Sequence, residues 1–272
     1  MKAYFELLRP LNGVMAAIAV LIGYWIGLGE IAFSQTIGLA LVSVFLIAGA
    51  GQTINDYFDR HLDKKLKPHR PLPSGRVRPH HAILYSFLLF VVGILLALFL
   101  TRDAFFIALF MSLALAGYSA FMRKAKWLGN FFVAFGTGVT IIFGASLTGN
   151  YGIVLWLFWP LFFANVGREI SKDLEDVQGD KGFKLTFPML VSESGAQIAV
   201  YLSYLLSALF AFYVFASGIV PKLPFISIAL LAVVGFAYSA WLVSQEKYRA
   251  SQKWSKISMI IALVAYLSIP LV

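Results

Sequence analysis

The chain has 272 residues, of which 60% are hydrophobic and only 13% are charged, and its formal net charge at pH 7 is +9. A soluble domain carries about 25% charged residues, so this composition excludes a soluble globular protein. The absence of cysteine excludes disulfides and thiolate metal sites. We therefore expect an integral membrane protein.

Nine uncharged apolar runs follow one another along the chain. Most of them reach the ~20 residues that a helix needs to cross the hydrocarbon core, whereas a membrane β-barrel would show ~10-residue alternating segments. The predicted fold class is therefore all-α, with about nine transmembrane helices in one polytopic membrane domain that covers residues 1–272. The runs occupy residues 10–29, 36–54, 80–101, 104–122, 127–149, 151–167, 195–220, 223–244 and 257–272.

Basic residues are distributed unevenly between the two sides of the expected bundle. With nine helices, 20 of the 22 lysines and arginines fall on the side of the N-terminus, and only Arg102 and Lys222 fall on the other side. Short cytoplasmic loops carry such an excess of lysine and arginine. The sequence thus predicts a cell-membrane protein with a cytoplasmic N-terminus and an external C-terminus. The positive charge does not require nucleic acid as a partner.

The first transmembrane helix is expected to begin at Pro10, after an amphipathic segment that carries Lys2 and Arg9. Asn12 places a polar amide just inside the membrane boundary. Such a residue either forms a hydrogen bond between helices or lines a substrate cavity. We keep both interpretations and count Asn12 among the candidates for substrate binding.

The most polar stretch follows the second apolar run and covers residues 55–75, NDYFDRHLDKKLKPHRPLPSG. If the helix continues into it, Asp56, Asp59 and Asp63 lie at i, i+3 and i+7 and share one face. Mutually repelling carboxylates on one face are typical of a cation site, and Mg²⁺ prefers oxygen ligands that it often shares with substrate phosphates. A solvated helix end is the simpler alternative for this stretch alone.

A second acidic stretch with the same spacing follows the sixth apolar run. Its sequence, DLEDVQGD, places Asp173, Asp176 and Asp180 at i, i+3 and i+7. Both stretches follow even-numbered helices, so both are expected at the cytoplasmic face, where they can lie opposite each other. The repetition argues against two unrelated acidic patches on the protein surface. It predicts that six carboxylates hold two Mg²⁺ ions.

Basic and aromatic residues near these carboxylates are candidates for contacts with phosphate. Arg70, with one or two neighbouring lysines, is expected to hold phosphate oxygens, although a positive-inside loop would also explain the charge. Tyr118 and Lys124 follow the fourth run and suit either a headgroup-facing pair or an ordinary membrane interface. Around the second stretch, the basic residues are Arg168, Lys172, Lys181 and Lys184.

A lipid-like chain that ends in a diphosphate matches this combination of carboxylates, basic loops and an apolar interior. Two Mg²⁺ ions would neutralise the diphosphate and stabilise it as a leaving group. If the chain is allylic, departure of the diphosphate leaves a carbocation, which a membrane-buried cavity protects from water. The isoprenoid diphosphate would be the donor, and a lipid-like molecule in the bilayer would be the acceptor.

These motifs resemble those of the UbiA superfamily of intramembrane prenyltransferases: NDYFDRHLD followed by RPLPSG, and REISKDLEDVQGDK followed by TFP. The resemblance extends over the whole chain and implies a ring of nine helices around a central cavity, capped on the cytoplasmic side. It implies metal and diphosphate binding by Asn55, Asp56, Asp59, Asp63, Asp173, Asp176 and Asp180. It further implies phosphate contacts for Arg70 and Lys124, and a place near the reacting end of the substrate for Tyr118.

Within the superfamily, REISKDLEDVQGD and the short N-terminus are most similar to the branch that makes archaeal ether lipids. This branch transfers a geranylgeranyl group from geranylgeranyl diphosphate to the sn-2 hydroxyl of geranylgeranylglyceryl phosphate. An aromatic polyprenyltransferase of the quinone, chlorophyll or haem type is the nearest alternative. A cation-coupled transporter is the alternative of another class, but its carboxylates would lie near the bilayer midplane. The catalytic candidates are Asp59, Asp63, Asp176 and Tyr118, and the substrate-binding candidates are Asn12, Asn55, Arg70, Lys124, Arg168 and Lys172.

Overall fold

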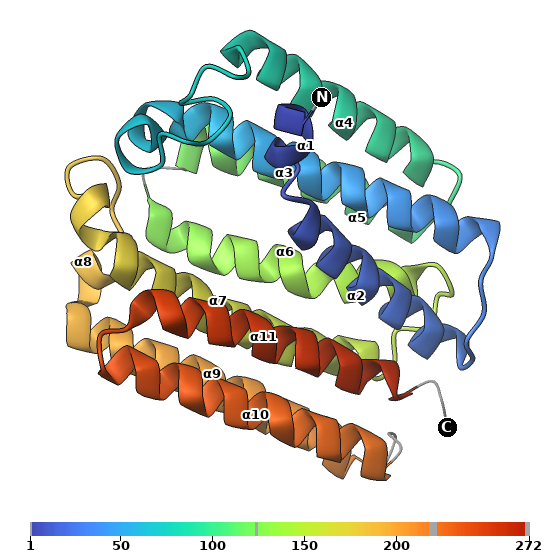
Figure 1. The fold of residues 1–272 in the computed structure, drawn as a ribbon. Helices are drawn as coiled ribbons and strands as arrows, with labels where there is room; N and C mark the ends of the chain where they lie inside the picture. The colour runs from blue at the N-terminus through green and yellow to red at the C-terminus, as the bar shows by residue number, and fades with distance from the viewer. Residues whose placement is uncertain (1, 123–124, 218–221, 270–272) are drawn as a thin grey trace.

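A computed structural model describes residues 2–122, 125–217 and 222–269 (Figure 1). Within these ranges the chain forms helices and connecting segments without strands, which confirms the all-α fold class. The elements are α1 (Lys2–Leu7), α2 (Pro10–Leu28), α3 (Gln35–Leu66), α4 (Pro79–Ala97), α5 (Arg102–Gly117), the π-helical turn η1 (Tyr118–Met122), α6 (Lys126–Ser146), α7 (Val154–Asp180), α8 (Phe187–Val191), α9 (Glu193–Ala216), α10 (Lys222–Ser244) and α11 (Tyr248–Leu267).

Nine long helices in the described part of the chain lie side by side, and each contacts the next one along the chain (Figure 1). The circuit closes where α11 contacts α2, so the expected ring order is present. Helix α2 also packs directly on α6 across the ring. A Cβ atom on Gly23 would lie 2.0 Å from the Ile141 carbonyl oxygen, and one on Gly144 would lie 2.0 Å from the Val20 carbonyl oxygen. Glycine at these two positions therefore allows the two backbones to touch.

Seven helices of the described residues are long and apolar enough to cross a membrane, and they identify a multi-pass membrane protein. They are α2, α3, α4, α5 with η1, α6, α9 and α10. Helices α7 and α11 do not meet this criterion. Each of them combines an apolar segment with several charged turns. The span expected at 151–167 begins before α7, and α7 continues past it to Asp180. The span expected at 257–272 begins inside α11, which starts at Tyr248 and ends at Leu267.

Helices α3 and α7 are long enough to carry the acidic stretches beyond the bilayer. The side chain of Ser34 caps the N-terminus of α3 by accepting a hydrogen bond from the Ile37 amide at 3.3 Å. From there α3 runs without interruption for 32 residues, and α7 runs for 27. At about 1.5 Å per residue, α3 is longer than the ~30 Å hydrocarbon core. Its last turns, which hold the first acidic stretch, therefore project past the hydrocarbon, as the continuous-helix expectation requires.

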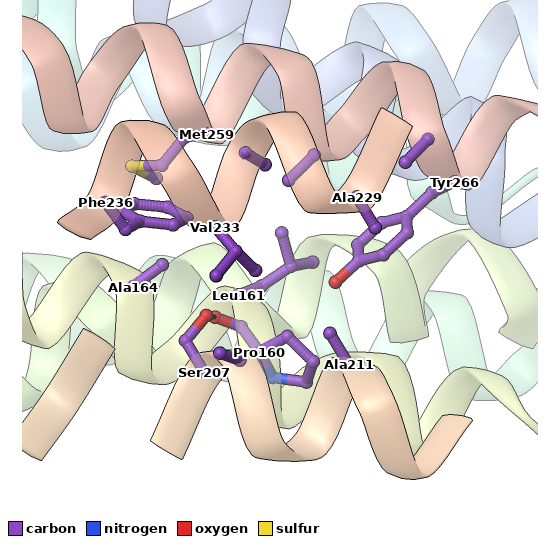
Figure 2. Close-up of a pocket in the computed structure, with 14 residues that line it drawn as sticks. Pro160, Leu161, Ala164, Ser207, Ala211, Ala229, Val233, Phe236, Met259 and Tyr266 are labelled. Carbon is purple, nitrogen blue, oxygen red and sulfur yellow. Dashed lines mark hydrogen bonds between the residues drawn. The ribbon is translucent and has the colours of Figure 1, made fainter. Parts of the chain in front are cut away.

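An apolar pocket lies between α7, α9, α10 and α11 (Figure 2). Its wall combines small side chains with larger apolar ones, and its polar groups are the hydroxyls of Ser207 and Tyr266. The Ser207 hydroxyl donates a hydrogen bond to the Pro160 carbonyl at 2.9 Å, so its polarity is satisfied within the helices. The pocket is therefore a small apolar cavity of about 30 Å³. The labelled residues are Pro160, Leu161, Ala164, Ser207, Ala211, Ala229, Val233, Phe236, Met259 and Tyr266.

Candidate active site

The last turns of α3 present the first acidic row, which consists of Asp56, Asp59 and Asp63. All three are buried, with at most 8% of each residue exposed. Burying three carboxylates on one helix face is unfavourable unless each has a cationic or hydrogen-bonding partner. The structure supplies these partners from segments that are distant in the sequence.

Two arginines and one lysine pair with the first row. Arg70 Nη1 lies 2.6 Å from Asp63 Oδ2 and 3.3 Å from Asp56 Oδ1, and the Arg9 guanidinium also binds Asp56. Lys184 Nζ lies 2.7 Å from Asp59 Oδ2. Arg9 adopts a left-handed backbone conformation, with φ of 47°, at the junction between α1 and α2. This uncommon backbone conformation turns the chain between α1 and α2, at the residue whose side chain binds the first acidic row.

The second acidic row lies on α7 and consists of Asp173, Asp176 and Asp180. One amine serves all three carboxylates: Lys126 Nζ is 3.0 Å from Asp173 Oδ1, 3.5 Å from Asp176 Oδ2 and 2.6 Å from Asp180 Oδ2. Asp173 also accepts hydrogen bonds from the Asn130 amide at 2.7 Å and from a backbone N–H at 3.0 Å. Lys126 is the first residue of α6, so a transmembrane helix fixes the position of this shared cation.

The two rows lie beside each other at one end of the bundle. Lys184, which follows α7, binds Asp59 of α3, and Lys67, which follows α3, lies 3.7 Å from Asp176 of α7. In the first pair the cation follows α7 and the carboxylate is on α3, and in the second pair the cation follows α3 and the carboxylate is on α7. A Cβ atom on Gly179 would lie 2.7 Å from Leu66 Cδ2, so the helix ends themselves are in contact. The expectation that both acidic stretches share one face of the protein is therefore met (Figure 1).

The carboxylates fit a hard divalent cation by their chemistry. Among the described residues no group of three or more His, Cys, Asp or Glu side chains is positioned to hold a metal, because basic side chains lie between the carboxylates. Two carboxylate oxygens among the described residues, Asp59 Oδ1 and Asp173 Oδ1, are buried without a hydrogen-bond partner, although Lys126 Nζ lies 3.0 Å from the second. An unsatisfied buried carboxylate oxygen is costly, and an oxygen-binding cation would satisfy it. The donor set of aspartate oxygens therefore suits Mg²⁺.

Among the described residues, Arg168 and Lys172 pair with Glu169, an acidic residue outside the two rows, and not with a carboxylate of either row. Arg168 Nη1 is 2.6 Å from Glu169 Oε1, and Lys172 Nζ is 3.0 Å from Glu169 Oε2. Burial alone would raise the pKa of Glu169, but the charges of Lys172 and Arg168 and a hydrogen bond from Lys172 outweigh it and lower the pKa to about 2. Glu169 is therefore a carboxylate at every physiological pH.

The pKa of Asp176 is also lowered, against the effect of its burial. Burial acts to raise it, but the positive charges of Lys126, Lys67 and Lys172 outweigh that contribution. The Asp176 side chain is 21% exposed, more than those of Asp173 and Asp180. Asp176 is thus the ionised carboxylate of the second row that a ligand can most readily reach.

The remaining candidates occupy different surroundings. Asn55 Nδ2 lies 3.4 Å from Asp59 Oδ2, which places Asn55 beside the first row. The Tyr118 ring stacks on Phe132 with ring centroids 5.1 Å apart, and it lies close enough to Asp59 for their charges to interact. Asn12 Oδ1 accepts a hydrogen bond from Lys256 Nζ at 3.1 Å, and in the part of the chain that the structure describes it forms no hydrogen bond with either row. Lys124 lies outside the described residues, and the roles predicted for all these side chains remain predictions.

Three site residues were not assigned by sequence reasoning: Arg9, Lys126 and Glu169. Arg9 and Lys126 were counted only as basic residues that indicate topology, and the spacing of charges does not show which loop residue reaches a carboxylate. Lys184 was expected around the second row, but it binds the first. A usable signal was available for Glu169, because it lies four residues before Asp173 and so on the same helix face.

Comparison with known proteins supports a relationship over almost the whole chain. The model of the UbiA prenyltransferase family matches residues 16–264. A digeranylgeranylglyceryl phosphate synthase from Methanosphaera stadtmanae is 34% identical over 98% of this chain and 98% of its own length. The digeranylgeranylglyceryl phosphate synthase of Thermococcus kodakarensis is 36% identical over 100% of this chain and 99% of its own length.

Solved structures share the same arrangement of helices. A structure of a digeranylgeranylglyceryl phosphate synthase matches with a TM-score of 0.80 and 30% identity, covering 99% of this chain and 98% of its own. A UbiA homologue from Archaeoglobus fulgidus, bound to DMAPP and Mg²⁺, matches with a TM-score of 0.69 and 18% identity, covering 97% of this chain and 99% of its own. The second likeness concerns the fold alone.

Proposed function

The chain belongs to the UbiA prenyltransferase family, and from this premise we propose that it transfers a geranylgeranyl group from geranylgeranyl diphosphate to the sn-2 hydroxyl of geranylgeranylglyceryl phosphate. The bond between C1 of the donor and its diphosphate breaks, and an ether bond forms between C1 and the sn-2 oxygen. The hydroxyl proton is lost and diphosphate is released. The product is an archaeal ether-lipid precursor.

The observation that carries this proposal is the meeting of two buried carboxylate rows at one end of a membrane bundle. Two ion pairs join the rows, Lys184 with Asp59 and Lys67 with Asp176. Such a site suits the polyanionic head of a lipid-like substrate whose chain lies in the membrane. The choice of acceptor rests on the relatives, which are digeranylgeranylglyceryl phosphate synthases at about a third identity over nearly their full length.

Mg²⁺ is the cofactor that this proposal includes, and we place two ions between the rows. Bound Mg²⁺ would neutralise the diphosphate oxygens and stabilise the leaving group. The relative from Archaeoglobus fulgidus, which was solved with DMAPP and Mg²⁺, supports this choice. The proposed ligands are Asn55, Asp56, Asp59, Asp63, Asp173, Asp176 and Asp180.

The basic side chains of the site have a second role in this proposal. Arg70, Lys67 and Lys184 would donate charge-assisted hydrogen bonds to diphosphate oxygens, while the carboxylates they now contact would hold the metal. In this proposal Tyr118, which interacts electrostatically with Asp59 and Asp173, would lie near the reacting end of the donor. Its ring and that of Phe132 would exclude water from the allylic carbon.

We further propose that the site faces the cytoplasm, with the N-terminus inside and the C-terminus outside. The uneven distribution of basic residues supports this orientation. Because the chain lacks cysteine, single cysteines can report it. A membrane-impermeant maleimide should label Glu30→Cys in intact cells and Lys181→Cys only after permeabilisation; both residues are exposed. The reverse pattern would contradict the orientation.

Reconstitution of the purified protein in nanodiscs tests the reaction. With geranylgeranyl diphosphate, Mg²⁺ and geranylgeranylglyceryl phosphate, mass spectrometry should detect digeranylgeranylglyceryl phosphate, and EDTA should abolish its formation. An aromatic acceptor such as 4-hydroxybenzoate should give no prenylated product. Prenylation of the aromatic acceptor instead would favour the aromatic branch, and a Mg²⁺-independent protein without transferase activity would contradict the enzyme assignment.

A further inference from the structure

A partly buried lysine with no acidic partner lies near the start of α11. Lys256 Nζ donates a hydrogen bond to Asn12 Oδ1 at 3.1 Å, and among the described residues no carboxylate oxygen lies within ion-pair distance of it. Lys256 precedes the apolar run that begins at residue 257, so it lies at the site end of the helix. Most basic side chains around the two rows are paired, whereas Lys256 contributes an uncompensated positive charge.

The nearest charged neighbours of Lys256 are also positive. Burial lowers the pKa of Lys256, and the charges of Arg168 on α7 and Arg9 before α2 lower it further. Arg168 uses Nη1 for Glu169, but its Nε is buried and has no hydrogen-bond partner. Arg9 binds Asp56 of the first row. Lys256 is thus the one member of this group without a carboxylate partner among the described residues, and a bound anion would compensate its charge.

The apolar pocket of Figure 2 lies between the same two helices that hold Lys256 and Arg168. On α7, Ala164 lines the pocket one turn before Arg168. On α11, Met259 lines it almost one turn after Lys256. The cationic groups are therefore at the site end of α7 and α11, and the apolar wall begins about one turn, or ~5 Å, deeper. Cationic groups next to apolar helix faces are the arrangement that an anionic amphiphile requires.

We propose that Lys256, together with Arg168 and Asn12, binds the phosphate of the isoprenoid glyceryl phosphate acceptor, whose chain extends from there along the apolar parts of α7 and α11. The proposal rests on the proposed function and assigns the acceptor to its own site. Arg9 binds Asp56 of the first row, and its charge also acts on Lys256, so Arg9 connects the acidic rows electrostatically with the Lys256 site. The glyceryl hydroxyl would then lie on the side of the acidic rows.

The donor diphosphate is a poorer occupant of the Lys256 site. Metal-binding carboxylates are needed next to a diphosphate leaving group, and no carboxylate of the rows pairs with Lys256 among the described residues. A phosphate monoester, with less charge and no role as a leaving group, matches a site built from a lysine, an arginine and an amide. Phospholipid headgroups and inorganic phosphate share this chemistry, so the experiment includes both.

The binding experiment uses the full protein in nanodiscs with EDTA and without donor, so that neither metal nor turnover contributes. Isothermal titration with geranylgeranylglyceryl phosphate compares wild type with Lys256→Gln, for which we expect about 10- to 100-fold weaker binding from the loss of one charge-assisted hydrogen bond. Lys256→Arg should restore most of the affinity. Lys253→Gln is the matched control, because Lys253 is exposed one turn earlier on the same helix, and it should bind like wild type.

Three other ligands identify the source of the phosphate. Geranylgeranylglycerol, which lacks the phosphate, should bind wild type and Lys256→Gln equally. Neither inorganic phosphate nor a nanodisc containing phosphatidylglycerol should displace the acceptor from wild type at matched concentrations. If either one competes as well as the acceptor does, the site is a general phosphate or lipid-headgroup site and the proposal is wrong.

Steady-state kinetics separates this inference from the proposed function. Lys256→Gln should raise KM for geranylgeranylglyceryl phosphate about tenfold or more and leave KM for geranylgeranyl diphosphate unchanged. A normal acceptor KM in this variant, with an active wild type, would overturn the inference alone. A wild type that makes no product from this acceptor would overturn the proposed function and the inference together.

Discussion

The two acidic rows have the same spacing but are neutralised in different ways. On α3, three carboxylates meet three cations from separate places in the chain: Arg9, Arg70 and Lys184. On α7, three carboxylates converge on a single amine, Lys126 Nζ, which lies within 3.5 Å of each. Identical spacing in the sequence therefore does not determine how a row is balanced.

The difference lies in where the cations are anchored. Arg9, Arg70 and Lys184 belong to connecting segments, so each can withdraw from its carboxylate without moving a helix. Lys126 begins α6 and occupies the central position between the three carboxylates of its row. A cation at that position reduces the mutual repulsion of all three aspartates at once. In the first row, Asp59 can open by the loss of Lys184 alone, whereas Asp56 and Asp63 share Arg70; the second row depends on one charge shared by all three carboxylates.

The largest effect is expected from removing a carboxylate in either row. Asp59→Asn and Asp176→Asn should each reduce kcat by about 10²- to 10³-fold, because each removes a charge that positions the leaving group. The measurement is product formation at saturating substrates and Mg²⁺. Asp103→Asn is the control, because Asp103 pairs with Tyr151 and neither residue touches the rows. An active variant in one row would show that the two rows do not form a joint site.

Lys126→Met tests the dependence of the second row on a single cation. Removing one partner of a buried ion pair costs about 3–5 kcal/mol in the free energy of unfolding, and here three carboxylates lose their partner. Lys184→Met should cost less, because among the described residues Lys184 pairs with a single carboxylate, that of Asp59. Thermal unfolding in detergent with EDTA measures the difference. Mg²⁺ should raise the Tm of Lys126→Met more than that of Lys184→Met, and equal responses would contradict the comparison.

Glu169, which lies four residues before Asp173, should make the free energy of unfolding depend on pH. The pKa of Glu169 is about 2 in the folded protein against 4.5 ordinarily. Because the folded pKa is the lower one, ionised Glu169 stabilises the protein above pH 4.5, and this contribution is lost as pH falls towards 2. Glu169→Gln should therefore lower stability by about 2 kcal/mol near pH 6 and by progressively less as the pH falls to 3. A Tm difference that stays constant from pH 6 to pH 3 would contradict the assignment.

The smallest effect is expected where the ends of α3 and α7 touch. In Gly179→Ala, the new Cβ would lie 2.7 Å from Leu66 Cδ2, so the flexible Leu66 side chain must move. Alanine in a helix gains up to about 1 kcal/mol over glycine, which offsets that cost. We expect a change within ~1 kcal/mol in thermal unfolding and a nearly unchanged kcat. A large loss of activity would show that the reaction depends on the distance between the two rows more strongly than their ion pairs indicate.

Hydropathy and charge spacing predict much of the fold and part of the site. Nine apolar runs anticipated the long helices, and the helix of α3 continues through Asp56, Asp59 and Asp63 as the i, i+3, i+7 spacing requires. These features are local, because a helix places residues three or four apart on one face. The ends of α7 and α11 were less predictable, since charged turns extend both helices beyond their apolar segments.

The sequence by itself determined a helical membrane protein with two aspartate rows on the same side. Only the tertiary structure decided which cation meets which carboxylate: Lys184 binds the row on the other helix, and Lys126 serves three aspartates that follow it by about fifty residues. It also brought Lys256 close enough to Arg168 for their charges to interact, and within the described ranges gave Lys256 an amide partner, Asn12, in place of a carboxylate. The physical reason is that Coulomb attraction depends on distance in space, and packing of the helices sets that distance independently of separation along the chain.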